Sequence, residues 1–340
     1  MKKLRVMMLT HAYMLPPDDL KSRNDPRIES YRTEFDVRQA LQKLGHEVIM
    51  VGLNDDITPV RETIEEWKPD IVFNLMEAFA ENGALAYYIV SYLDMMGIPY
   101  TGCNPRGLLL AGDKAISKQM LTYHRIRVPK FYTLHHNKKI NLKQVAKYPY
   151  PMIVKSTVEQ GSIGISQSSL VTNAEELRDR AEQLFSMLDG DAIAEQYIEG
   201  RELYVGVIGN DRLEVLPTRE LIFSNIDDKM HRIATYNVKW NEKYRKRWGI
   251  DYQFARNLPG KVVDDLPKLA KRIYRILNIS SYARLDLRLT ESGEIYVLEA
   301  NPNAAIARDD DFASAADKAG IPYEKLIQKI LNLGLKNNST

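Results

Sequence analysis

The chain has 340 residues, of which 44% are hydrophobic and 27% charged, and its formal net charge is +2. This length suits two or three packed subdomains, and the small net charge gives no reason to expect nucleic acid or a membrane surface as a partner. The single cysteine, Cys103, excludes an intrachain disulfide and a cysteine-based zinc cluster, and it is compatible with a reducing cytoplasm.

The N-terminus begins like a signal peptide, with two lysines before an apolar run. Arg5 interrupts that run, however, and Pro16-Pro17-Asp18-Asp19 ends it before any small-residue cleavage site. No stretch approaches the roughly 20 apolar residues that a membrane-spanning helix needs. We therefore expect a basic first strand in a soluble, cytoplasmic protein without a membrane partner.

Strands and helices alternate over residues 1–112. The periodicity predicts strands at 4–10, 47–51, 70–74 and 99–101, and helices at 27–44, 58–67 and 82–96. This order predicts right-handed crossovers and an open parallel sheet, which makes residues 1–112 a Rossmann-like domain. The G-x-G-x-x-G fingerprint of dinucleotide-binding domains is absent, so the sequence does not favour an NAD site.

The pattern changes after about residue 128, where turn signals join several of the apolar runs. We predict strands at 152–155, 193–197, 202–208 and 213–216, and helices at 174–188 and 262–277. Residues 229–250 are basic and aromatic without clear periodicity, which predicts a long loop. The fold is therefore expected to combine α/β and α+β parts, in domains 1–112, 113–193 and 194–340.

Two predicted strands near the C-terminus, 282–289 and 294–298, are joined by a hairpin turn. Antiparallel pairing across that turn would bring Asp286 near Glu299 and Asn301, which together offer the hard oxygen ligands that Mg²⁺ prefers. Arg284 lies two residues before Asp286, on the same face of its strand, and would hold a phosphate or an oxyanion. The alternative is a hairpin whose charged ends are simply solvated.

A Gly- and Ser-containing turn, Glu159–Ser166, follows the strand that ends near Lys155. Its backbone N–H groups would bind phosphate oxygens and the turn would close as a lid, although it lacks the ending of a P-loop. Lys114 and Lys155 are candidate phosphate contacts, unless their stems extend to solvent.

Another candidate is the stretch 195–202, which contains Glu195 and Glu202. Its extended backbone would contact an adenine edge and its glutamates would bind ribose hydroxyls. The alternative is that these residues are ordinary surface charges.

Taken in chain order, these features resemble the ATP-grasp ligases, and specifically the D-alanine–D-alanine ligase branch. The stretches that carry the resemblance are Phe73-Asn74, Glu81-Asn82-Gly83, Pro99-Tyr100-Thr101-Gly102, Asp113-Lys114-Ala115-Ile116-Ser117-Lys118, Gly161-Ser162-Ile163-Gly164 and Leu298-Glu299-Ala300-Asn301-Pro302. The resemblance covers roughly residues 70–335. It implies an ATP-grasp fold and an ATP-dependent carboxylate–amine ligase that forms an acyl phosphate and releases ADP and phosphate.

The resemblance also implies a role for each matching residue. Lys114 and Lys155 would contact the ATP phosphates and Ser162 would belong to the lid. Glu195, Gln196 and Ile198 would line the adenine pocket, and Glu202 would face the ribose. Lys239 would reach the γ-phosphate and Arg284 would stabilise the oxyanion. Asp286, Glu299 and Asn301 would hold two Mg²⁺ ions, with Mn²⁺ as a substitute. The family is often dimeric, so the resemblance is compatible with a homodimer, although the sequence does not set the oligomeric state.

Two segments that bind substrate in the D-alanine ligases do not match. Residues 10–19 lack the family's Gly/Ser/Glu motif, which holds the ammonium of the first D-alanine, and residues 303–311 lack its Pro-Gly-Met-Thr and the following serine. Trp240 stands where the family usually has tyrosine. We therefore expect small-molecule or short-peptide substrates other than D-alanine. The alternatives are a D-alanine–D-alanine ligase of cell-wall synthesis, a non-catalytic nucleotide-binding regulator and a kinase-like enzyme without an amine step.

The second replaced segment and the predicted loop at 229–250 offer three further candidates. Asp309, Asp310 and Asp311 would either receive an amine or cap a helix that starts near Phe312. Arg308 would hold a substrate carboxylate. The basic residues of the predicted loop would either attract an acidic substrate or form a solvated face; they are Lys239, Lys243, Arg245, Lys246 and Arg247.

Overall fold

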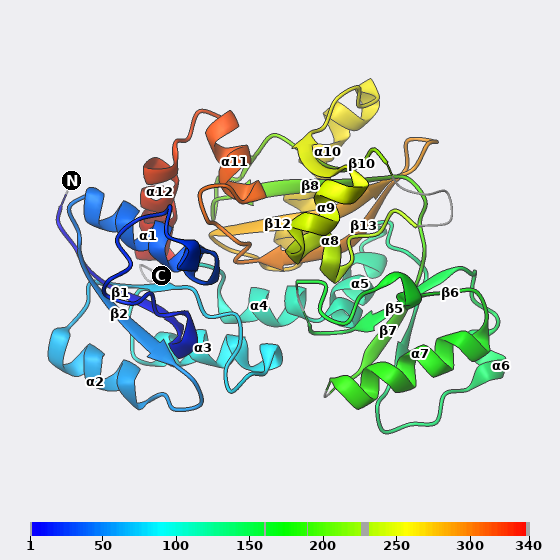
Figure 1. The fold of residues 1–340 in the computed structure, drawn as a ribbon, viewed down its shortest axis with the longest axis horizontal. Coiled ribbons are helices and arrows are strands. Elements are labelled where there is room, and N and C mark those ends of the chain that lie inside the picture. Colours follow the sequence, from blue (N-terminus) through cyan, green and yellow to red (C-terminus); the bar gives the residue numbers. More distant parts are fainter. Residues whose placement is uncertain (1, 160, 189, 226–230, 338–340) are drawn as a thin grey trace.

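The computed structural model describes residues 2–159, 161–188, 190–225 and 231–337. Within them the strands form a three-stranded, a four-stranded and a six-stranded sheet (Figure 1). Strands of the first sheet run parallel, whereas those of the other two run antiparallel. The predicted combination of a parallel N-terminal sheet with antiparallel sheets is therefore confirmed.

The N-terminal sheet has the strand order β2-β1-β3. Its elements are β1 (Arg5–His11), α1 (Arg32–Lys43), β2 (Glu47–Leu53), α2 (Thr58–Trp67), β3 (Ile71–Asn74) and α3 (Ala86–Met95). Successive side chains of β1 point to opposite faces, so Val6 and Met8 pack with α1 while Met7 and Leu9 pack with α2 and α3. Helices therefore cover both faces of this sheet.

Three predictions in this region need correction. The helix predicted at 27–44 is a 3-10 helix, Pro26–Tyr31, followed by α1. The helix predicted at 82–96 likewise starts with a 3-10 turn, Gly83–Leu85, before α3. The strand predicted at 99–101 is reduced to an isolated bridge between Tyr100 and Val72. In the first two cases an Asx side chain, Asp25 or Asn82, caps a short turn ahead of the helix.

The middle of the chain supplies the four-stranded sheet, with the order β4-β7-β5-β6. Its elements, after α4 (Pro105–Gly112) and α5 (Lys114–Tyr123), are β4 (Phe131–Leu134), α6 (Leu142–Val145), β5 (Met152–Ser156), β6 (Leu170–Val171), α7 (Ala174–Met187) and β7 (Ala192–Gln196). Asp113 begins α5, because its carboxylate accepts the backbone N–H groups of Ala115 and Ile116. This cap fixes the start of the helix that carries Lys114.

The six-stranded sheet has the order β11-β10-β8-β12-β13, with β9 paired to β8. Its strands are β8 (Arg201–Ile208), β9 (Glu214–Val215), β10 (Arg219–Phe223), β11 (Ile250–Phe254), β12 (Tyr282–Leu289) and β13 (Ile295–Pro302). One face packs against α10 (Gly260–Ile276). The hairpin predicted from residues 282–298 is confirmed as β12 and β13.

The prediction of a long loop at 229–250 is wrong over the described residues 231–250. They contain α8 (Tyr236–Trp240) and α9 (Glu242–Trp248), and residue 250 begins β11. Both helices are too short to show an apolar period, yet caps mark them, because Thr235 accepts the N–H of Val238 and Asn241 that of Tyr244. Residues 229 and 230 lie outside the described residues.

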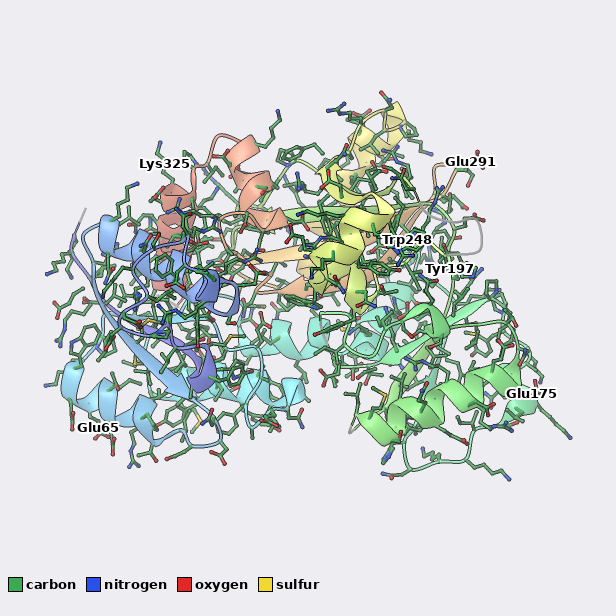
Figure 2. The ribbon with its side chains drawn as sticks, viewed as in Figure 1. Glu65, Glu175, Tyr197, Trp248, Glu291 and Lys325 are labelled. Atoms are coloured by element: carbon green, nitrogen blue, oxygen red, sulfur yellow. The ribbon has the colours of Figure 1, made fainter. Side chains whose placement is uncertain are left out.

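The last two helices, α11 (Asp311–Lys318) and α12 (Tyr323–Asn337), return to the N-terminal part of the chain. Figure 1 shows α12 beside α1, and Ile327 and Ile330 of α12 lie in one core with Val37 of α1. Figure 2 shows Glu65 of α2, Glu175 of α7 and Lys325 of α12 at the periphery. The domain boundaries after residues 112 and 193 stay a prediction. None of the described helices is long and apolar enough to cross a membrane.

Candidate active site

A polar face of the six-stranded sheet follows from the alternation of side chains along β12. Leu285 and Leu287 point into the core that α10 covers. The residues between and beside them, Arg284, Asp286 and Arg288, point to the opposite face. There Arg288 donates to the carboxylate of Glu202, its partner across β8, at 2.8 Å. The charged residues of β12 thus share one face because of the strand period alone.

The hairpin brings the candidate metal ligands together as expected. Asp286 pairs directly with Glu299, and Arg284 with Asn301. The guanidinium of Arg284 donates to both carboxylate oxygens of Asp286, at 2.7 and 2.9 Å. Asn301 lies beside Glu299, with its Nδ2 atom 3.5 Å from Oε1. The predicted proximity is present, while the metal-binding role stays a prediction.

The donor set of this hairpin fits Mg²⁺ rather than a metal bound wholly by the protein. Within residues 2–337, apart from the undescribed positions, no group of three or more His, Cys, Asp or Glu could hold a metal ion. Two carboxylates and one amide oxygen remain, and Mg²⁺ is commonly bound by one or two carboxylates together with waters and substrate phosphates. The residues therefore suit a magnesium ion that arrives with a nucleotide.

Electrostatics distinguish the two carboxylates. Burial raises the pKa of Asp286 to about 6, although Arg284 opposes the increase. Burial also favours the neutral form of Glu299, but Lys114, Lys155 and Lys239 outweigh it and hold the pKa of that carboxyl well below its usual range. Glu299 is therefore ionised at neutral pH, and a cation beside Asp286 would favour its ionised form too.

Three buried lysines surround Glu195 and Glu299 where α5, β5, β7 and β13 meet. The Nζ atom of Lys155 lies 3.2 Å from Glu195 and 3.9 Å from Glu299. Lys114 lies 3.9 Å from Glu299 and donates to the carbonyl of Glu159 at 2.7 Å. Three lysines against two glutamates leave a surplus of one positive charge, which suits a polyphosphate.

Lys118, the third lysine, has no role in the sequence-based predictions. It is 1% exposed, lies 3.4 Å from Glu195, and donates to the carbonyl of Leu298. Leu298 is the extra residue of a β-bulge that follows the Asp286–Glu299 pair, so Lys118 supplies a hydrogen bond at a break in the ladder. The spacing i, i+4 from Lys114 places both lysines on one face of α5 and is the signal that could have identified it.

The predicted adenine and ribose residues lie at the end of β7 and the start of β8. Glu195 and Ile198 are buried, and Gln196 is partly exposed. Glu202 is engaged by Arg288 and by the hydroxyl of Tyr204, which donates at 2.8 Å. The adenine and ribose roles stay predictions.

The turn predicted to be a phosphate lid is fastened to α8 and the residues before it. We call residues 161–166 the lid loop; Gln160 lies outside the described residues. Ser162 donates to the carbonyl of Ala234 at 2.6 Å, and Trp240 donates its indole N–H to the carbonyl of Gly161 at 2.8 Å. Gly161 and Ser162 have φ values of +65° and +61°, which a glycine adopts freely and a serine rarely. The lid loop and α8 thus form one closed unit, close to Lys239.

The three consecutive aspartates, Asp309, Asp310 and Asp311, form an acidic triplet in which each carboxylate pairs with an arginine. Arg23 donates to Asp309 at 2.7 Å, Arg32 to Asp310 at 3.2 Å, and Arg219 to Asp311 at 3.2 Å. Asp310 stands at the N-cap position of α11, where acids favour a helix start, but it makes no side-chain capping hydrogen bond and instead accepts the backbone N–H of Ala307 at 2.6 Å. These contacts account for the three carboxylates without an amine ligand.

The basic candidates also have partners within the protein. Arg308 donates to Glu324 at 2.8 Å. Arg245 donates to the carbonyl of Lys239, at the end of α8, and Lys246 pairs with Glu242. These contacts account for part of the basic cluster without a ligand.

Known proteins resemble this chain over most of its length. The sequence profile of the family described as D-ala D-ala ligase C-terminus matches residues 120–332. A D-alanine–D-alanine ligase of Carboxydothermus hydrogenoformans is 28% identical over 314 residues, which cover 90% of this chain and 94% of that protein. An uncharacterised protein of Sinorhizobium fredii is 29% identical over 306 residues, covering 86% of this chain and 84% of that protein.

A solved structure shares the fold over almost the whole length. The D-alanine–D-alanine ligase of Bacillus anthracis, solved in complex with ATP, superposes with a TM-score of 0.75 and 22% identity, covering 98% of each chain. The predicted ATP-grasp fold is thereby confirmed. Because the family profile spans well over half of its residues, the chain belongs to the D-alanine–D-alanine ligase family of ATP-grasp enzymes, which form carbon–nitrogen bonds.

Proposed function

We propose that the chain is an ATP-dependent carboxylate–amine ligase that works through an acyl phosphate and releases ADP and phosphate. The observation that carries the proposal is the β12–β13 hairpin, which sets Arg284, Asp286 and Glu299 on one face beside the buried lysines. Relatives named D-alanine–D-alanine ligases support the same reaction class.

In the first half-reaction, a carboxylate oxygen of one substrate attacks the γ-phosphorus of ATP. The bond from that phosphorus to the β-phosphate oxygen breaks, and ADP leaves with the electron pair. Lys114, Lys155 and Lys239 would offset the charge of the phosphates. Asp286, Glu299 and Asn301 would hold Mg²⁺, as two ions or with Mn²⁺ in its place, which would neutralise further phosphate charge.

In the second half-reaction, a neutral amine attacks the acyl carbon. Arg284 would face the oxyanion that forms, phosphate leaves with the electrons of its bond to carbon, and the amine loses its proton to the departing phosphate or to water. An acyl phosphate hydrolyses readily, so the lid loop and Trp240 would serve to exclude water.

The identity of the substrates has two candidate answers. The names of the relatives favour D-alanine in both positions. The departures at residues 10–19 and 303–311, where arginines pair with the acidic triplet, favour another amino acid, a short peptide or a specialised metabolite. A non-catalytic regulator has less support, because binding ATP alone gives no reason to keep Arg284 with the metal-binding residues.

The test is ATP turnover with Mg²⁺ and pairs of candidate acids and amines, beginning with D-alanine alone. We expect release of ADP and phosphate that depends on both substrates, and a product whose mass is that of the amide. Formation of AMP would refute the acyl-phosphate route. A stable phosphorylated acid would identify a kinase, and ATP binding without any turnover would identify a regulator.

A further inference from the structure

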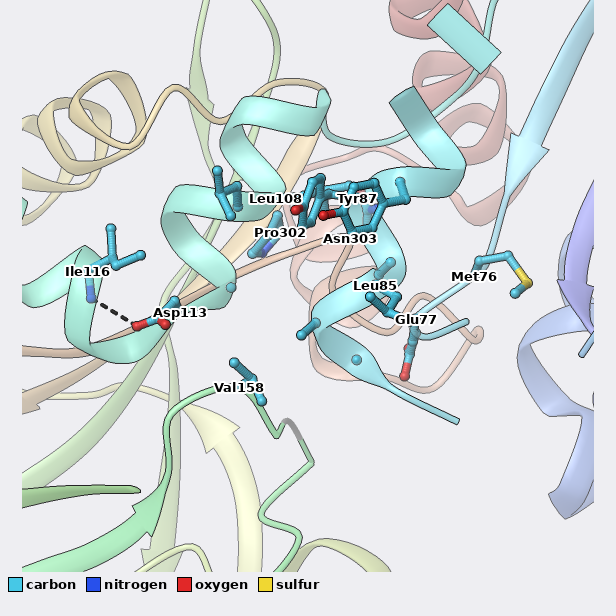
Figure 3. Close-up of a pocket in the computed structure, with 16 residues that line it drawn as sticks. Met76, Glu77, Leu85, Tyr87, Leu108, Asp113, Ile116, Val158, Pro302 and Asn303 are labelled. Atoms are coloured by element: carbon cyan, nitrogen blue, oxygen red, sulfur yellow. Dashed lines mark hydrogen bonds between the residues drawn. The ribbon is translucent and has the colours of Figure 1, made fainter. Parts of the chain in front are cut away.

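A cavity of about 300 Å³ lies next to the proposed reaction centre (Figure 3). Its walls come from the segment after β3, from α3 and α4, from the residue Val158 and from the end of β13. Most of the lining is apolar, including Met76, Leu85, Tyr87, Leu108 and Ile116. Binding sites for small molecules are often concave and apolar with a few polar groups, as this cavity is.

The cavity shares its walls with the proposed catalytic residues. Pro302 and Asn303 line it, and they directly follow Asn301 on β13. Two residues of strand span about 7 Å, so a molecule in the cavity lies within reach of the metal-binding hairpin. Asp113 lines the opposite side, immediately before Lys114, whose ammonium lies 3.9 Å from Glu299.

One carboxylate of the cavity wall has no partner. Figure 3 shows Glu77 on the far side of the cavity from Asp113. Within the part of the chain that the structure describes, its carboxylate makes no hydrogen bond or ion pair. The Glu77 side chain is exposed by surface area, but the walls of the cleft around it desolvate the carboxylate and raise the pKa of Glu77 to about 7, and the negative charges of Glu34 and Asp310 add to the increase. A cationic group in the cavity would relieve this repulsion.

Resting on the proposed ligase function, we propose that the cavity receives the apolar side chain of the amino acid that supplies the carboxylate, and that Glu77 binds its ammonium group. The family's glutamate for this ammonium is absent from residues 10–19, and Glu77 offers the charge from the end of a different strand. A methyl group fills about the 30 Å³ of one water molecule, so alanine would leave most of the cavity empty. The expected donor therefore carries a side chain the size of leucine or phenylalanine.

The first experiment measures the donor alone, with hydroxylamine as the amine that traps the acyl phosphate as a hydroxamate. Alanine, leucine and phenylalanine are compared as both enantiomers, and ADP and hydroxamate are followed. We expect kcat/KM for leucine or phenylalanine to exceed that for alanine by about tenfold or more, since one methylene in an apolar pocket is worth about 10- to 200-fold. Equal or faster turnover of alanine would overturn the inference while the proposed function stands. Failure of every donor would instead count against the proposed function.

Two variants test the cavity and its charge separately. Ala84 is an exposed residue of the wall, and Ala84→Phe should lower kcat/KM for the large donor about tenfold while sparing alanine. The matched control is Ala319→Phe, at an exposed position after α11, which should change neither. An Ala84→Phe enzyme with unchanged preference would contradict the subsite.

Glu77→Gln should raise KM for the amino acid about tenfold or more, and it should leave the affinity for ATP unchanged. The same change should not affect 3-phenylpropanoate, which has no ammonium group. Glu65→Gln, on the exposed face of α2, is the matched control. An unchanged KM for the amino acid in Glu77→Gln would overturn the proposed role of this residue.

Discussion

Asp286 is paired with Arg284 in this structure, and the proposed reaction would require it to face Mg²⁺ instead. Arg284 likewise has a role in that reaction that requires it to face another group. Asp286→Asn keeps the size of the side chain and removes the charge that would hold Mg²⁺. We expect turnover to fall at least about 100-fold, because even outer-shell partners of a metal are worth about 10- to 100-fold.

The measurement is ADP release across a titration of Mg²⁺, with the thermal midpoint as a check on folding. Asn is preferred to Ala at this position, because Ala would leave the buried guanidinium of Arg284 without any acceptor. Asp265→Asn, on the exposed face of α10, is the matched control and should behave as wild type. An Asp286→Asn enzyme with normal turnover and normal Mg²⁺ dependence would disprove the metal assignment.

The raised pKa of Glu77 predicts that the stability of the fold depends on pH. This pKa rises from 4.5 to about 7 on folding, so between these values the folded chain holds a proton that the unfolded chain has released. The stability that Glu77 contributes is fully present below about pH 4.5 and is lost as the pH rises through about 7. Relative to wild type, Glu77→Gln should therefore become more stable from pH 5 to pH 8, as thermal unfolding will measure. A constant difference across this range would contradict the prediction.

At the scale of elements, the lid loop and α8 close on each other through a residue that differs from the family's usual tyrosine. The indole N–H of Trp240 reaches the carbonyl of Gly161, and the Ser162 hydroxyl reaches that of Ala234. Trp240→Phe keeps an aromatic ring and removes one hydrogen bond, worth about 1 kcal/mol. We expect KM for ATP to rise about 3- to 10-fold and ATP hydrolysis without amine to increase.

Steady-state kinetics with and without the amine will check this prediction. Trp67→Phe, in α2 beside Arg5, is the matched control, because this tryptophan packs against the N-terminal sheet, away from the lid loop. If Trp240→Phe left both KM for ATP and the uncoupled hydrolysis unchanged, the hydrogen bond would have no part in closing the lid.

At the scale of the whole molecule, ion pairs join the N-terminal part of the chain to the segment after the β12–β13 hairpin. Asp36 of α1 is fully buried, accepts from Arg23 at 2.9 and 3.0 Å, and accepts the backbone N–H of Arg308 at 2.9 Å. Asp36→Asn should lower the free energy of unfolding by about 1–3 kcal/mol, as urea denaturation will measure.

A substitution at Asp309 tests whether the burial of Asp36 determines how much unfolding free energy Asp36→Asn loses. It pairs with the same Arg23, but its side chain is 52% exposed. Asp309→Asn should cost less than about 1 kcal/mol, because solvent and salt screen exposed pairs. Equal losses in the two variants would mean that the network, rather than the burial of Asp36, determines the stability.

The elements that the sequence predicts depend on local signals. The hairpin of β12 and β13 follows from its turn and its period of two, so Arg284, Asp286, Glu299 and Asn301 were placed together before any tertiary contact was known. Helices α8 and α9 do not follow from such signals, because five and seven residues are too few to show a period.

The sequence by itself determined the alternation of strands and helices over residues 1–112, the polar face of the hairpin and the family. Only the tertiary structure decided which distant residues meet: Lys118 reaches a carbonyl 180 positions away, and the acidic triplet after β13 pairs with arginines from α1, β10 and the loop before α1. The cavity at Glu77 likewise forms from segments between residues 76 and 303. A short-range pattern carries no information about such contacts, because they depend on how sheets and helices pack rather than on the period of any one element.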